Sequence, residues 1–97
     1  MRILLAEDEV GLSRAYATAF GMQGYEVVQA FDGERALELA SSEIFDLMIF
    51  DIMMPKMTGL EVLKKIRDAG NSTYIIILTA MSELNDKIEG LDLGADE

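Results

Sequence analysis

Three residue types are missing from this chain of 97 residues: cysteine, histidine and tryptophan. Without cysteine the chain can form neither a disulfide nor a thiolate metal site. Without histidine it has no imidazole ligand, no Ser-His-Asp triad and no histidine of its own to phosphorylate. Basic residues are scarce as well, because 8 Lys and Arg stand against 18 Asp and Glu, a net charge of −10. We therefore expect no contact between this segment and nucleic acid, since binding a phosphate backbone requires clusters of Lys and Arg.

Long hydrophobic runs are also missing. No apolar run approaches the roughly 20 residues of a membrane-spanning helix. The apolar start, Met1 to Ala6, is too short for a signal peptide and leads directly into acidic residues. We therefore expect a cytoplasmic location and no membrane contact. A hydrophobic content of 51% is enough to fill a core, and the length predicts one domain over residues 1–97, since domains typically have about 100–150 residues.

Short apolar runs alternate with stretches in which apolar residues recur at helical spacing. Four runs have the composition of strands buried on both faces. They span residues 2–6, 25–30, 46–50 and 74–78. A helical stretch follows each run, as the i, i+4, i+8 spacing of Leu12, Tyr16 and Phe20 illustrates. The order predicts four βα units, which form an open, doubly wound α/β sheet of parallel strands with helices on both faces.

Several helix boundaries can be predicted from capping residues. Asp32 is a typical N-cap for the second helix. Thr58 with Glu61 three residues later has the pattern of a capping box, which starts the third helix. We expect Gly59 to serve the tight start of this helix and not to cradle a phosphate. A fourth helix is predicted over residues 84–91.

Three acidic residues fall at the predicted carboxyl ends of strands. Glu7 and Asp8 follow the first strand, and Asp51 follows the third. Open α/β sheets place ligand sites at this edge, and neighbouring strands lie about 4.8 Å apart. If the first and third strands are neighbours, three carboxylates share a small volume, which favours a hard divalent cation such as Mg²⁺. The alternative is that these acids are solvated loop residues.

Four segments together resemble one protein family. They are residues 3–9 (ILLAEDE), 46–59 (DLMIFDIMMPKMTG), 77–80 (ILTA) and 94–97 (GADE). In this order and spacing the sequence is similar to the receiver domains of two-component response regulators, and most similar to those of the OmpR/PhoB type. The resemblance implies a flavodoxin-like (CheY-like) sheet with strand order 2-1-3-4. It also implies a signalling domain and not an enzyme.

The resemblance assigns a role to each matching residue. Asp51 corresponds to the aspartate that accepts a phosphoryl group from a sensor histidine kinase. Glu7, Asp8 and Asp51, with the backbone carbonyl of Met53, correspond to the Mg²⁺ site. Thr79 corresponds to the hydroxyl that switches toward the phosphoryl group. The implied output is transcription control through a DNA-binding domain that is absent from these residues.

The sequence departs from the family pattern at its C-terminal side. The family's lysine at the end of the fifth strand has no counterpart here, and the fifth strand and helix are missing, so we expect an incomplete receiver domain. Lys56, Lys64, Lys65 and Lys87 are expected to be solvated charges. The fourth strand would then be an apolar sheet edge, which predicts a homodimer or a strand-swapped assembly.

Three other functions were weighed against the receiver. An aspartyl phosphatase generally carries a second Asp two residues after its nucleophile, where this chain has Met53. A flavin-binding protein of this fold needs a phosphate loop after the first strand, where Glu7, Asp8 and Glu9 would repel phosphate. An interaction module that cannot be phosphorylated stays open, because the lysine is missing.

Overall fold

The computed structural model describes residues 1–78. Its elements follow the predicted alternation of strands and helices. They are β1 (Arg2–Ala6), α1 (Val10–Met22), β2 (Glu26–Ala30), α2 (Gly33–Ser42), β3 (Leu47–Asp51), α3 (Gly59–Asp68) and β4 (Tyr74–Leu78). The predicted fourth helix, Thr79 and the motif at 94–97 lie outside the described residues.

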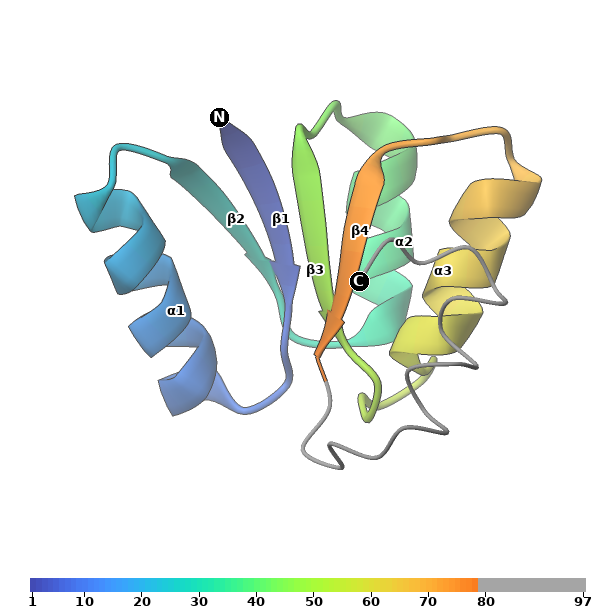
Figure 1. The fold of residues 1–97 in the computed structure, drawn as a ribbon. Coiled ribbons are helices and arrows are strands. Elements are labelled where there is room, and N and C mark those ends of the chain that lie inside the picture. The colour runs from blue at the N-terminus through green and yellow to red at the C-terminus, as the bar shows by residue number, and fades with distance from the viewer. Residues whose placement is uncertain (79–97) are drawn as a thin grey trace.

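The four strands form one parallel sheet in the order β2-β1-β3-β4, which confirms the predicted topology. All four arrows point toward the same edge in Figure 1. Ala6 at the end of β1 pairs with Phe50 of β3, and Asp51 pairs with Leu78 of β4. The chain leaves β1 toward β2 and later returns to β3 on the other side of β1. The strand order therefore reverses between β1 and β3, where sheets of this class bind their ligands.

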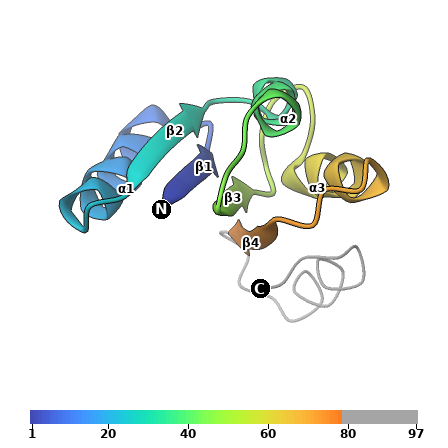
Figure 2. The same ribbon diagram turned by 90° about the horizontal axis from the view of Figure 1, so that it is seen from above.

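Helices cover both faces of the sheet. Figure 2 shows α1 on one face, and α2 with α3 on the other. Because side chains alternate along a strand, Ile3, Leu5 and Ile49 pack on the α1 side with Tyr16 and Phe20 as partners. The alternate residues pack on the other side in a larger core with α2 and α3. This core includes Leu4, Ala6, Met48, Phe50, Leu39, Val62, Leu63 and Ile75.

Three strand boundaries, one in β2 and two in β3, differ from the prediction by one residue. β2 begins at Glu26, because Gly24 has φ of 87° and the Tyr25 amide still donates to Phe20 O at 3.2 Å. β3 begins at Leu47 and includes Asp51 as its last residue. The later start of β3 goes with the side chain of Asp46, whose Oδ2 accepts a hydrogen bond from the Arg2 amide at 2.7 Å. The fourth predicted strand has the bounds of β4.

The predicted helix starts are confirmed. Asp32 Oδ1 accepts a hydrogen bond from the Arg35 amide at 2.7 Å. Thr58 and Glu61 form a complete capping box, in which each side chain bonds the other residue's amide. A Cβ atom on Gly59 would lie 2.2 Å from Asp51 O. The start of α3 can therefore pack this closely against the end of β3 only with glycine at this position.

None of the helices among residues 1–78 is long and apolar enough to cross a membrane. The expected association through the fourth strand stays a prediction.

Thr58→Ala is expected to lower the free energy of unfolding by about 1 kcal/mol, because an N-cap hydroxyl that serves a helix amide contributes about this much. Urea titrations followed by circular dichroism measure the change. Thr58→Ser is the matched control, since its hydroxyl can make the same bond to the Glu61 amide. Equal losses in both variants would contradict a role for the capping box.

Candidate metal centre

The three predicted acids come together at the carboxyl edge of the sheet. Asp51 is the last residue of β3, and Glu7 and Asp8 directly follow β1. Glu7, Asp8 and Asp51 can each place one carboxylate oxygen so that all three oxygens lie within 4.8 Å of one another. The adjacency of β1 and β3, which was a condition of the sequence argument, is what produces this cluster.

Backbone hydrogen bonds hold these residues in place. The Glu7 amide donates to Ala30 O at 3.0 Å and so extends the pairing of β1 with β2 by one residue. The Ile52 amide donates to Leu78 O at 3.1 Å, which fixes the chain just beyond Asp51. The pairing of the sheet therefore fixes the backbone on which Glu7 and Asp51 stand.

Burial differs sharply within the cluster. Glu7 is only 4% exposed, whereas Asp51 is half-buried and Asp8 is exposed. Burial raises the pKa of Glu7 to about 8, with further contributions from its hydrogen bond with Asp51 and from the charges of Asp51, Asp8 and Glu9. Glu7 Oε2 is a buried oxygen with no hydrogen-bond partner. Without a cation, the Glu7 carboxyl therefore keeps its proton at neutral pH.

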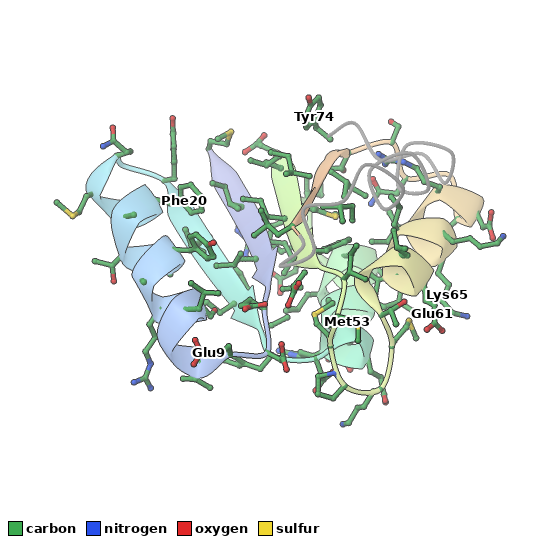
Figure 3. All side chains as sticks on the ribbon, turned by 60° about the horizontal axis from the view of Figure 1, so that its bottom comes forward. Glu9, Phe20, Met53, Glu61, Lys65 and Tyr74 are labelled. Atoms are coloured by element: carbon green, nitrogen blue, oxygen red, sulfur yellow. The ribbon has the colours of Figure 1, made fainter. Side chains whose placement is uncertain are left out.

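The cluster fits a hard divalent cation. Mg²⁺ prefers oxygen ligands and is usually bound by a few carboxylates together with water molecules. Glu7, Asp8 and Asp51 supply the carboxylates, and the unpartnered Glu7 Oε2 is a buried acceptor that a cation would satisfy. Met53 lies in the loop two residues after Asp51 and is 66% exposed. Because Mg²⁺ takes oxygen ligands, the backbone carbonyl of Met53 and not its thioether is the candidate ligand. Figure 3 shows Met53 in this loop.

Glu9, the third acid of the Glu7-Asp8-Glu9 run, has a different role. Its carboxylate accepts hydrogen bonds from the Gly11 amide at 3.0 Å and from the Leu12 amide at 2.7 Å. Glu9 is therefore the N-cap of α1, and Figure 3 shows it at the start of this helix. This role of Glu9 was not predicted from the sequence. The available signal was an acidic residue directly before a helix, where the helix dipole favours negative charge.

The lysines in the described range behave as expected for solvated charges. Lys56 Nζ lies 3.8 Å from Asp32 Oδ2, and Lys64 Nζ lies 3.0 Å from Asp68 Oδ2. Both side chains are more than half exposed. Lys87 and Thr79 lie outside the described residues, so the predicted switch role of Thr79 stays a prediction.

Comparison with known proteins identifies relatives that share this architecture. Residues 3–97 match the family described as the response regulator receiver domain. The chain is 48% identical over 97 residues to the transcriptional regulatory protein DltR of Streptococcus agalactiae, a match that covers 100% of this chain and 43% of DltR. The chain thus spans less than half the length of this relative.

Solved structures show the same likeness. A receiver domain of Francisella response regulator 1452 superposes with a TM-score of 0.96 at 35% identity, over 99% of this chain and 79% of that chain. Response regulator TrrA of Thermotoga maritima, solved in complex with Mg²⁺ and beryllium fluoride, superposes with a TM-score of 0.88 at 38% identity, over 99% of this chain and 82% of that chain.

The raised pKa of Glu7 predicts how stability depends on pH. A carboxyl whose pKa is higher in the folded chain than in the unfolded chain binds more protons when folded. Stability is then lost as pH rises from the unfolded pKa of about 4.5 through the folded pKa of about 8. We expect the metal-free protein to be less stable at pH 7.5 than at pH 6, with a slope of up to about 1.4 kcal/mol per pH unit.

No histidine or cysteine titrates within this window, because the chain has neither. Urea unfolding at several pH values, with a chelator present, measures the slope. Glu7→Gln is the matched control, since it resembles the protonated carboxyl and should remove most of the pH dependence. The same slope in both proteins would contradict a protonated Glu7.

Proposed function

This chain belongs to the response regulator receiver domain family of two-component signalling, and we propose that Asp51 accepts a phosphoryl group from a sensor histidine kinase in an Mg²⁺-dependent reaction. The observation that carries the proposal is the cluster of Glu7, Asp8 and Asp51 within 4.8 Å at the edge where the strand order reverses. We propose that residues 1–97 belong to one receiver domain.

Magnesium is the cation that this site would bind. The proposed ligands are Asp8, Asp51 and the Met53 carbonyl, with Glu7 acting directly or through a bound water. The related response regulator TrrA, which was solved in complex with Mg²⁺ and beryllium fluoride, supports this choice of metal. When bound, the cation would offset the repulsion between the Asp51 carboxylate and an anionic phosphoryl donor. Where Glu7 binds the cation directly, it would give up its proton, because ligands must be deprotonated.

The proposed transfer needs little more than positioning and charge neutralisation. A carboxylate oxygen of Asp51 forms the new P–O bond while the P–N bond to the kinase histidine breaks, and the imidazole keeps the electron pair of that bond. Asp51 is suited to this attack, because it is half-buried at the end of β3 and therefore both fixed and reachable. The product is an acyl phosphate on Asp51.

Phosphorylation is proposed to act by shifting the domain between two conformations. The proposed sensor of the phosphoryl group is Thr79. It is the next residue in the sequence after Leu78, which pairs with Asp51 in the β3–β4 register. In the parent protein the output is proposed to be transcription control by a DNA-binding domain. The related protein DltR, a transcriptional regulatory protein more than twice as long as this chain, supports that output.

Phosphorylation of Asp51 can be tested directly. The chain is incubated with acetyl phosphate and Mg²⁺, and its intact mass is measured. We expect a mass increase of one phosphoryl group that a chelator abolishes and that Asp51→Asn lacks. Asp68→Asn is the matched control, because Asp68 is an exposed helix residue paired with Lys64, and it should be phosphorylated like the unmodified chain.

Calorimetric titration with Mg²⁺ separates the steps of the proposal. Asp8→Asn and Asp51→Asn are each expected to weaken Mg²⁺ binding, since each removes a ligand charge. An unmodified chain that binds Mg²⁺ but forms no adduct would contradict the phosphorylation and favour the alternative, an interaction module that cannot be phosphorylated. A chain that binds no Mg²⁺ would contradict the metal site itself.

A further inference from the structure

The loop that leads from Asp51 to α3, residues 52–58, contains the one non-glycine residue with positive φ in the described chain, Lys56 at φ of 70°. The Met57 amide donates to Pro55 O at 2.8 Å across this residue. Such an i to i+2 hydrogen bond around a residue of positive φ is a rare and strained γ-turn. A strained backbone persists only where its surroundings hold it in place. Neighbouring residues must therefore hold the turn at Lys56 in place.

The first residues of α2 hold the γ-turn at Lys56. The Gly33 amide donates to the same Pro55 oxygen at 3.2 Å, so this carbonyl accepts one hydrogen bond from the loop and one from α2. Asp32, the N-cap of α2, uses one carboxylate oxygen to cap the helix and turns the other toward Lys56 Nζ at 3.8 Å. The strained residue is thus held through both its preceding carbonyl and its side chain.

This docking requires the absence of a side chain at position 33. A Cβ atom on Gly33 would lie 2.0 Å from Met57 O and 2.7 Å from both Met57 C and Met57 Cβ. The carbonyl cannot swing aside as the end of a flexible side chain could. Since non-bonded heavy atoms pack at about 3.5–4.0 Å, an alanine would force α2 and the loop apart by about 1 Å or more.

We propose that Gly33 is a positioning residue for the acidic site: its missing side chain lets α2 clamp the 52–58 loop in the conformation that presents the Met53 carbonyl beside Asp8 and Asp51. The loop is fixed at its other end by the Gly59 amide, which donates to Ile52 O at 2.9 Å. A displacement at Pro55 to Met57 is therefore passed on to the few residues between, which include Met53. This inference rests on the proposed Mg²⁺ site.

Mg²⁺ makes the site sensitive to such a displacement. It demands a near-ideal octahedral shell at about 2.0–2.1 Å, so a carbonyl that moves away cannot follow the ion as a flexible carboxylate can. Residues that orient ligands without touching the metal typically change its affinity about 10–100-fold. Gly33→Ala is therefore expected to raise the dissociation constant for Mg²⁺ about 10-fold or more.

Calorimetric titration of Mg²⁺ alone into the folded variants tests this. Gly21→Ala is the matched control, because Gly21 lies in α1 and a Cβ there meets nothing within 4 Å. We expect its dissociation constant to equal that of the unmodified chain. A merely structural role for Gly33 would lower the unfolding temperature and leave the Mg²⁺ affinity of the folded protein unchanged, and that result would overturn the inference.

A second measurement uses the unmodified chain and so does not depend on the folding of Gly33→Ala. Coupling between two sites is reciprocal, so Mg²⁺ should strengthen the docking of α2 on the loop. We expect Mg²⁺ to slow hydrogen exchange at the Gly33 and Met57 amides more than at the Glu43 amide, which bonds Leu39 O at the far end of α2. Equal protection of all three amides would overturn the inference.

The two proposals can fail separately. If the unmodified chain binds no Mg²⁺, the proposed function fails and this inference falls with it. If the unmodified chain binds Mg²⁺ and Gly33→Ala binds it equally well, only the positioning role of Gly33 fails.

Discussion

Repulsion among three carboxylates at one edge of the sheet is the constraint on which this domain depends. The pairing of β1 with β3 brings Glu7, Asp8 and Asp51 to the same edge of the sheet, where one carboxylate oxygen of each lies within 4.8 Å of the others. The cluster can relieve its repulsion in only two ways, by keeping a proton on the buried Glu7 or by binding a cation. A proton and a bound cation would therefore compete for the Glu7 carboxyl.

Most of the fold could be predicted from the sequence, because each strand is a short apolar run and apolar residues recur at helical spacing in each helix. The run Tyr74–Leu78 matches β4 residue for residue, and the capping box of Thr58 and Glu61 starts α3 as predicted. The one-residue shifts at Glu26 and Leu47 come from contacts distant in sequence or from turn geometry. Asp46, for example, bonds the Arg2 amide 44 residues away, and no local pattern reveals such a partner.

The acidic residues of the candidate site could also be predicted from the sequence, because they lie at the carboxyl ends of the predicted strands. Glu7, Asp8 and Asp51 could be found as acids that follow apolar runs, once β1 and β3 were taken as neighbours. The supports of the site could not be found in this way. Glu9 caps α1 although Glu is an uncommon cap, and the need for glycine at position 33 arises from Met57 of a different loop. Both depend on how separate elements pack.

The distribution of basic residues argues that the acidic edge is built for an external cation. At the opposite edge of the sheet, Arg2 pairs with Glu26 at 2.5 Å and with Glu43, and its guanidinium stacks over the Phe45 ring at 4.7 Å. Two acids there thus share a cationic partner that the protein itself supplies. At the carboxyl edge, no Lys or Arg within residues 1–78 forms an ion pair with Glu7, Asp8 or Asp51. The chain has a net charge of −10. Without a basic partner, the three acids therefore create a negative potential at this edge, which attracts cations and repels an anionic phosphoryl donor that comes without one. A cation bound at this edge would therefore favour the proposed phosphoryl transfer to Asp51.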